Sequence, residues 1–414
     1  MEDISLRIAG FNKNRLEGLL PLKYEAMAEN LFRFYRGTNH IFYEDLAKSN
    51  CMPVSPLVWI SGDLHLENFG SYKSENRLVY FDLNDFDDAL LAPASWELAR
   101  MVTSIFIAFE SMEIERAKAM NMAELFLKSY ARTLSAGKPD YLEPKTARGI
   151  VREFLKAVSK RKQKDILARR TVQRKNKLEI LLDDPRHLEL EQDLKEDLMH
   201  HINHWLKYDG NSPYNYKVTD AVFRLAGTGS IGVKRYALLL KSLNAEGEKY
   251  MLIDMKQSTG SALAPFVGIP QPAWMTDADR IVTIQQRMQN RPPALLSTTI
   301  FRNECFVVQE MQPTKDSIDF KLVKRKYRHL YQVIDDMGML TASAQLRSRG
   351  RQGAAIADEL IDFGNSREWQ KDILQYASSY ARQVKKYYVQ FLTDYNKHAF
   401  SAQHGNGLDG KKIA

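Results

Sequence analysis

Cysteine is scarce in this chain: its 414 residues include only Cys51 and Cys305. Two cysteines cannot build a disulfide framework, so the sequence favours a reducing compartment. Long apolar segments are also missing, because no run of about eighteen apolar residues occurs and the N-terminal region carries scattered charges. These absences exclude a disulfide-stabilised secreted domain and predict a cytoplasmic protein that makes no membrane contact.

The composition is that of a globular protein, with 44% hydrophobic and 27% charged residues. A chain of this length can bury a full core as one domain of two lobes or as two ordinary domains. Its formal net charge of +8 favours anionic partners. Nucleotides, phosphorylated metabolites, nucleic acid and acidic proteins all belong to that class, and charge alone does not choose among them.

The first part of the chain has mainly helical patterns. Apolar positions recur at helical spacing from residue 20 to 50, and the segments 57–60 and 78–83 are typical of short strands that flank a loop. After Pro93, Ser95 suits a helix N-cap. The helix that follows is apolar on most sides, which predicts a buried position.

The pattern changes in the middle of the chain. Residues 120–208 are highly charged and predict helices, and the turn-rich "YDGNSPYN" that follows indicates a lobe boundary. Strands are predicted beyond it, and helical spacing returns from residue 329 onward. The sequence therefore predicts an α+β protein. Its expected segments are helices in 1–210, a β-rich lobe in 211–315, returning helices in 316–400 and a disordered tail in 401–414.

Two acidic loops carry the clearest chemical signal. The first is "WISGDLHLENFG", and the second, "FDLNDFDDA", ends an apolar strand. Their polar residues are Asp63, His65, Asn68, Asp82, Asp85, Asp87 and Asp88. Mg²⁺ prefers carboxylate and amide oxygens and keeps several waters for substrate phosphates, so two such loops together would suit it. Taken alone, an acidic cluster is more often a solvated turn.

A glycine-rich turn and a lysine follow in the β-rich segment. The turn "GTGSIG" lies between two predicted strands, and its glycines would let backbone amides approach phosphate oxygens. A strand after the third glycine disfavours a Rossmann site, and a plain hairpin explains the glycines about as well. In "MLIDMKQS", Lys256 lies inside an apolar strand, where its charge needs a partner or an anion. A lysine that reaches solvent from a strand edge is the alternative.

Together these motifs resemble the kinase-like phosphotransferases, in particular the aminoglycoside and choline kinase branch. "SGDLHLEN", "NDFDDA" and "PASWELA" match in type and order the catalytic loop, the metal-binding strand end and the helix start of that branch. The resemblance implies an ATP- and Mg²⁺-dependent enzyme with two lobes. It implies that Asp63 orients or deprotonates the acceptor hydroxyl, supported in the loop by His65 and Asn68, and that Glu97 supports this catalytic loop.

The resemblance also implies which residues bind the nucleotide and the metal. The metal ligands would be Asn68 and Asp85, with Asp87 for a second ion. Nucleotide contacts would come from the glycine loop, the lysine and a hinge at "FVVQEMQP". These residues are Gly227, Thr228, Gly229, Ser230, Gly232, Lys256, Glu310 and Gln312.

The order of the motifs is reversed relative to ordinary kinases, in which the glycine loop and the lysine precede the catalytic loop. We interpret this order as a circular permutation, which is tolerated when the old termini lie close together and the new ones are exposed. From about residue 20 to 395 the chain also resembles a bacterial family of unknown function that is grouped with the kinase-like fold. That resemblance bears on the fold and leaves the substrate open.

Some positions depart from the kinase-like pattern. Ser61 replaces the histidine that commonly precedes Gly-Asp. No glutamate stands where the helical partner of the lysine is expected, and the helix "DADRIVTIQQRMQ" offers Asp279, Gln285 and Gln286 instead. Lys256 would then be held mostly by phosphate.

Other functions stay open at this point. A nucleotidyltransferase of the same fold and a catalytically silent nucleotide-binding module both retain these motifs. A metallophosphoesterase is less favoured, because none of the nine histidines lies in the later motif that its two metals need. The acceptor is a small molecule or a protein. Ten basic residues between Lys156 and Lys177 face one acid, but no nucleic-acid motif accompanies them, so nucleic acid is an unsupported partner.

Overall fold

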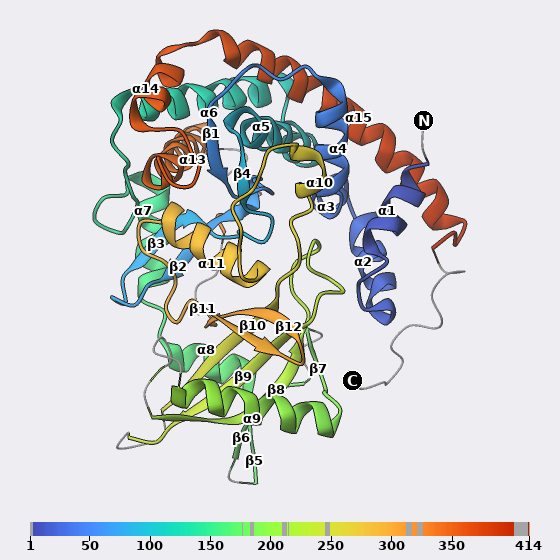
Figure 1. The fold of residues 1–414 in the computed structure, drawn as a ribbon, viewed down its shortest axis with the longest axis vertical. Helices are drawn as coiled ribbons and strands as arrows, with labels where there is room; N and C mark the ends of the chain where they lie inside the picture. Colours follow the sequence, from blue (N-terminus) through green and yellow to red (C-terminus); the bar gives the residue numbers. More distant parts are fainter. Residues whose placement is uncertain are drawn as a thin grey trace.

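The computed structural model describes residues 3–175, 177–182, 186–208, 213, 215–244, 249–311, 317–320, 326–400 and 413. It confirms the expected α+β class, with a large helical part and one six-stranded antiparallel sheet (Figure 1). The predicted hinge residue Gln312 and most of the predicted tail lie outside the described residues.

Four short helices open the chain: α1 (Ile4–Asn12), α2 (Leu20–Ala28), α3 (Leu31–Gly37) and α4 (Asn39–Ser49), with a 3-10 turn, η1 (Glu17–Leu19), before α2. The side chain of Asn30 caps α3 by accepting a hydrogen bond from the backbone N–H of Arg33 at 2.9 Å. These helices confirm the helical pattern predicted from residue 20 to 50.

Two small antiparallel strand pairs flank the two acidic-loop motifs. The first joins β1 (Leu57–Ile60) to β4 (Leu90–Pro93), and the second joins β2 (Phe69–Lys73) to β3 (Val79–Leu83). The 3-10 turn η2 (Leu66–Asn68) leads directly into β2. The loops after β1 and after β3 therefore lie within one compact unit, which places both acidic motifs near each other.

The helical part continues with α5 (Ala94–Ser111), α6 (Arg116–Ala136) and α7 (Gly149–Ser159), and returns after the sheet with α13 (Tyr327–Ser348), α14 (Ala357–Asn365) and α15 (Glu368–Asn396). As predicted, α5 is buried on most sides. Its N-cap is Pro93 rather than the expected Ser95, because the chain leaves β4 directly into the helix. Helix α13 packs on α6, and α15 packs on α5, so early and late segments share one core.

The six-stranded sheet has the strand order β11-β12-β10-β9-β8-β7. Its strands are β7 (His187–Leu188), β8 (Tyr216–Arg224), β9 (Arg235–Ser242), β10 (Tyr250–Gln257), β11 (Ser297–Phe301) and β12 (Glu304–Glu310). On β9, alternate residues face opposite sides: Leu238 and Leu240 join the core with α9 (Gln192–Tyr208), whereas Ala237 and Leu239 face the other core. Both faces of the sheet are thus covered.

The region from 120 to 208 is less helical than predicted. After α8 (Gln163–Arg170), the chain forms the strands β5 (Thr171–Arg174) and β6 (Lys177–Ile180), and Ile180 is buried against the sheet. Helix α9 and strand β7 also pack with the sheet. The structural unit around the sheet therefore begins before the expected boundary between residues 210 and 211.

Two helices connect the sheet to the helical part: α10 (Ala264–Val267) and α11 (Asp277–Met288), both between β10 and β11. Helix α11 packs on β11 and β12 on one side and on α13 on the other. Among the described helices, none is both long enough and apolar enough to cross a membrane.

Candidate active site

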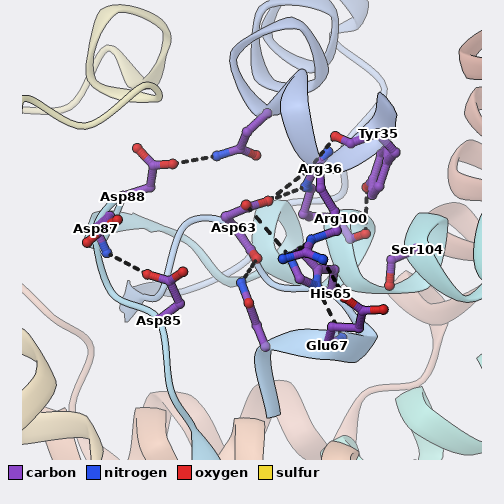
Figure 2. Close-up of polar contacts among 12 residues, drawn as sticks. Tyr35, Arg36, Asp63, His65, Glu67, Asp85, Asp87, Asp88, Arg100 and Ser104 are labelled. Carbon is purple, nitrogen blue, oxygen red and sulfur yellow. Dashed lines mark hydrogen bonds and ion pairs between the residues drawn. The ribbon is translucent and has the colours of Figure 1, made fainter. Parts of the chain in front are cut away.

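The predicted catalytic loop follows β1 and touches the acidic loop that follows β3. Gly62 lies between them with φ of +84°, and a Cβ at this position would come within 2.2 Å of the carbonyl oxygen of Asp88. Only glycine fits this contact, because any side chain would separate the two loops. The Gly-Asp pair of the motif thus has a physical role in bringing Asp63 beside the acidic residues (Figure 2).

Asp63 is held by a buried arginine. Its Oδ1 accepts hydrogen bonds from Nη2 of Arg100 at 2.7 Å and from Nε of Arg100 at 3.1 Å. The guanidinium stacks over the ring of Tyr35 at 3.6 Å. Burial raises the pKa of Asp63 to about 7, with Asp88 and Asp85 adding repulsion, although Arg100 acts in the opposite direction. The Asp63 carboxyl therefore exchanges its proton near neutral pH, as a general base requires.

A buried hydrogen-bond network around Glu97 stabilises the loop that carries Ser61 and Asp63. Oε1 of Glu97 accepts hydrogen bonds from the backbone N–H of Ser61 at 2.6 Å and from its hydroxyl at 2.7 Å. Oε2 accepts one from Nε2 of Gln345 on α13 at 3.0 Å. Glu97 thus contacts the catalytic loop, as the resemblance implied. Ser61, which replaces a histidine of the kinase-like pattern, makes the contact through its hydroxyl.

His65 is a neutral, buried residue of this loop. Its Nδ1 lies 3.1 Å from the backbone N–H of Glu67, and its Nε2 lies 3.2 Å from Nε of Arg36. A neutral imidazole has only one acceptor nitrogen, so only one of these contacts is a hydrogen bond. Burial lowers the pKa of His65 well below its usual value, and Arg36 adds to the shift. The ring of His65 therefore lies between the loop backbone and Arg36 of α3, and its surroundings disfavour a charged imidazolium.

Asn68 stabilises the turn between Asp63 and β2 through its side-chain amide. Its Nδ2 donates a hydrogen bond to the carbonyl oxygen of Asp63 at 2.6 Å. Any metal bound by Asn68 must therefore meet its Oδ1. The side chain is buried, and it does not belong to the wall of the cavity that Asp63 lines.

The four aspartates of the second loop have different surroundings. Asp82 is buried and pairs with Nη2 of Arg347 at 3.1 Å. Both oxygens of Asp88 are engaged, one by Nδ2 of Asn39 at 2.8 Å and the other by the backbone N–H of Ala262 at 2.7 Å. Asp85 and Asp87 line the cavity together with Asp63. They are thus the two acidic side chains of this loop best placed to receive a cation.

Lys256 reaches this acidic loop from the sheet. Its side chain is only 14% exposed, and its Nζ forms an ion pair with Oδ2 of Asp87. Burial disfavours its charged form, but the carboxylates of Asp87 and Asp85 outweigh burial and raise its pKa. Of the three side chains that the sequence of α11 offered, Asp279, Gln285 and Gln286, Gln285 donates instead to Gln289 at 3.2 Å. Asp87 therefore serves as the acidic partner that the helix lacks.

The glycine loop connects β8 to β9 and covers the same cavity. Gly227 and Gly232 adopt positive φ angles of 71° and 89°, which favour glycine. Gly229 and Ser230 line the cavity wall. Thr228 is buried, and its hydroxyl accepts a hydrogen bond from Nε of Arg33 at 3.2 Å. The loop is therefore fixed against the N-terminal helices, a contact that the sequence did not indicate.

Glu310, the predicted hinge residue, ends β12. Its backbone N–H donates to the carbonyl oxygen of Ala294 at 3.0 Å, so this N–H is engaged within the protein. Its buried carboxylate pairs with Nη1 of Arg77 at 2.8 Å. The structure brings Glu310 to a smaller, separate cavity whose wall includes Asp254 and Arg235. A role for Glu310 in contacting a base stays a prediction.

The cavity that Asp63 lines has a volume of about 90 Å³ and a strongly charged wall. Its acidic residues are Asp63, Asp85, Asp87 and Asp88, and its basic residues are Arg15, Lys23 and Arg36. No group of three or more His, Cys, Asp or Glu side chains in the described part of the chain is arranged to hold a metal. A divalent cation would therefore need ligands from a bound substrate in addition to the protein.

A sequence model of the family described as "Uncharacterized protein conserved in bacteria (DUF2252)" matches residues 15–394. The chain belongs to the DUF2252 family. The match covers the predicted catalytic loop, the acidic loop, the glycine loop and the lysine strand. No curated protein and no solved structure matches the chain.

Some residues of this DUF2252 site escaped sequence analysis. Arg100 is the only charged residue after Glu97 in the first four turns of an otherwise apolar helix, and that isolation is the signal that could have revealed it. Arg15 and Lys23 gave no comparable signal, because they reach the site only through the packing of the N-terminal helices against the glycine loop.

Proposed function

We propose that this protein is an ATP- and Mg²⁺-dependent phosphotransferase with a kinase-like, circularly permuted fold that acts on a hydroxyl-bearing acceptor. The observation that carries the proposal is the ion pair between Lys256 and Asp87, which stand 169 positions apart. Asp87 lines the same cavity as Asp63, and Lys256 contacts Asp87 from the sheet. In kinases, a lysine, metal-binding acids and a catalytic aspartate all act on one triphosphate. The contact of Lys256 with the acidic loop, and the position of that loop beside Asp63, support the proposal by bringing side chains of these three types close together.

The topology of the sheet supports the same proposal. The glycine loop joins β8 to β9, Lys256 lies in the next strand, β10, and helix α11 follows before β11. Kinases carry a glycine-rich loop, then a lysine strand, then a helix that supports the lysine. The catalytic and acidic loops precede this unit in the chain, whereas α13 to α15 follow it. That order is what a circular permutation of the kinase-like arrangement would produce.

Asp63 would act as the general base in the transfer step. Its carboxylate accepts the proton of the acceptor hydroxyl as the acceptor oxygen forms a bond to the γ-phosphorus of ATP. The bond between this phosphorus and the oxygen that bridges to the β-phosphate breaks, and ADP leaves with the electron pair. Arg100 holds the Asp63 carboxylate in place through Oδ1, so that Oδ2 is the oxygen available to the proton.

The residues present fit Mg²⁺ as a cation that arrives with the nucleotide. Asp85 and Asp87 offer two carboxylates at the cavity, and Mg²⁺ commonly uses one or two carboxylates plus phosphate oxygens and waters. When bound, Mg²⁺ would neutralise charge on the phosphates during transfer. Lys256 would then exchange part of its contact with Asp87 for the α- and β-phosphates.

Transfer of the nucleotidyl group rather than the phosphoryl group would use the same residues. The outcome depends on which phosphorus faces the acceptor under the glycine loop. A two-metal phosphoesterase fits less well, because it needs a larger group of metal ligands than the described residues provide.

Nucleotide binding tests the proposal directly. Mg²⁺ with AMP-PNP, a non-hydrolysable ATP analogue, is titrated by calorimetry into the wild type and into Lys256→Met. We expect the affinity of Lys256→Met to fall about tenfold or more, because the phosphates lose their buried cation. Lys217→Met, which removes an exposed lysine from β8, is the matched control and should bind like the wild type. Equal affinity of Lys256→Met and the wild type would contradict the assignment of Lys256, and a wild type that does not bind would contradict the proposed function.

A further inference from the structure

The N-terminal helices add three basic residues to the cavity. Arg15 follows α1, Lys23 lies on α2 and Arg36 lies on α3, and all three line the cavity wall with Asp63. Arg36 also forms an ion pair with Glu67. Arg15 and Lys23 differ from it, because neither forms an ion pair with a carboxylate in the described part of the chain.

Lys23 is fully buried, with 0% of its surface exposed. Its Nζ donates a hydrogen bond to the carbonyl oxygen of Gly229 at 3.0 Å. Burial lowers its pKa well below the usual value, and the neighbouring charge of Arg15 lowers it further, while Asp88 and Asp63 oppose the shift. A buried ammonium beside a guanidinium is unfavourable unless an anion compensates both charges.

Arg15 binds the same loop. Its Nη1 donates to the carbonyl oxygens of Gly229 at 2.8 Å and of Ile231 at 2.7 Å. Carbonyl dipoles satisfy these donors but do not neutralise them. Three of the four cavity carboxylates have other partners: Asp63 pairs with Arg100, Asp87 pairs with Lys256, and Asp88 accepts from Asn39 and a backbone N–H. The fourth, Asp85, acts electrostatically on Lys256. Arg15 and Lys23 thus line the cavity without a carboxylate in hydrogen-bond contact, although Asp87 and Asp88 attract Arg15 from a longer distance. The charged form of Lys23 needs a further anion.

These two cations are distinct from the one expected to bind ATP. Lys256 approaches the acidic loop from the sheet, whereas Arg15 and Lys23 meet the glycine loop at Gly229 from the N-terminal helices. Asp63, the proposed base, belongs to the same cavity. An acceptor whose hydroxyl meets Asp63 would thus place its remaining groups near Arg15 and Lys23. A charged group of the acceptor would lie against the part of the wall that Arg15 and Lys23 form.

We propose that the acceptor is a small hydroxyl compound that already carries a phosphate monoester, and that Arg15 and Lys23 bind this phosphate. The inference rests on the proposed function and names the substrate class of the same site. A dianion would stabilise the charged forms of Arg15 and Lys23 together better than a single carboxylate would. The groups that face Lys23 are Arg15, Asp63, Asp88 and the carbonyl of Gly229, and they come from the N-terminal region, both acidic-motif loops and the glycine loop.

Inorganic phosphate serves as the probe for this site. Its affinity is measured by calorimetry with the full chain, first alone and then in the presence of saturating Mg²⁺ and AMP-PNP. We expect phosphate to bind in both conditions, and Lys23→Met to weaken phosphate binding about tenfold or more. Acetate, the carboxylate probe, should bind more weakly than phosphate. Lys13→Met removes a nearby exposed lysine and should bind phosphate like the wild type.

The outcomes separate this inference from the proposed function. Methionine has nearly the length of lysine and carries no charge, so Lys23→Met should fold, and Arg15→Gln provides a second variant with the same expected loss. Unchanged phosphate binding in both variants would overturn the inference. Competition between AMP-PNP and phosphate would also overturn it, because the cations would then serve the nucleotide itself. A wild type that binds phosphate but not AMP-PNP would instead refute the proposed function.

Discussion

Replacing Arg100 by glutamine should raise the pKa of Asp63. Burial has already brought this pKa to about 7, and Arg100 is the group that opposes burial most strongly. Glutamine keeps a hydrogen-bond donor but removes the positive charge. The Asp63 carboxylate would then lie between the repelling acids of the second loop and a neutral partner, so the protonated form would gain stability.

The magnitude follows from the contact geometry. Nη2 of Arg100 lies 2.7 Å from Oδ1 of Asp63, and the Asp63 side chain is 23% exposed. With about 4 Å between the charge centres and an effective dielectric constant of about 20, the attraction is about 4 kcal/mol. This energy corresponds to about three pKa units, and the partial exposure reduces it. We therefore expect an increase of roughly one to three units.

The assay observes Asp63 itself. Protein labelled with ¹³C at the aspartate carboxyl carbon is titrated by NMR, and the Asp63 signal is identified by its absence in Asp63→Asn. Arg132→Gln, which breaks the exposed pair with Asp335, is the control and should leave the Asp63 midpoint unchanged. If glutamine prevents folding, Arg100→Lys keeps the charge and should give a smaller rise. An unchanged or lower midpoint in a folded Arg100 variant would refute the electrostatic account of Asp63.

Two further predictions concern other carboxyl groups. Asp336 on α13 is held at a pKa of about 7 by burial and by the neighbouring Asp335, so the folded state binds its proton more tightly than the unfolded state. Asp336 therefore lowers the free energy of unfolding as the pH rises from about 4 through 7, and it has no such effect below that range. Asp336→Asn should raise the urea midpoint of unfolding more at about pH 8 than at about pH 5. Equal increases of the midpoint at the two pH values would contradict this prediction. Asp63→Asn should reduce ATP turnover by orders of magnitude while Mg²⁺ and AMP-PNP still bind, and a variant with normal turnover would show that Asp63 is not the base.

Local patterns explain how much of the fold could be predicted. Short apolar runs bounded by turn residues identified β9 and β10, and helical spacing identified α13 and α15, because both signals depend only on neighbouring positions. The strand β7 was missed because it has only two residues, and β5 and β6 were missed because their charged residues resembled a solvated helix.

The site residues also differ in whether a local sequence pattern could reveal them. Asp63, Asp85 and Lys256 could be singled out because their motifs have a characteristic spacing. The acid that pairs with Lys256 could not be predicted, because Asp87 contacts this lysine only after the sheet packs on the acidic loop. Lys23 lies in an ordinary-looking amphipathic segment, and its importance comes from contact with Gly229, 206 positions later. Tertiary packing of this kind leaves no mark in a single sequence.

Transfer of label from ATP tests the central claim most directly. The wild type is incubated with Mg²⁺, an extract of cell metabolites and ATP labelled at either the γ- or the α-phosphate. The account predicts that γ-label moves to a small molecule, that α-label stays with the nucleotide, and that Asp63→Asn abolishes the transfer. Transfer of the α-label would show nucleotidyl chemistry instead, and no transfer of either label would contradict the claim that these residues form a working phosphotransferase.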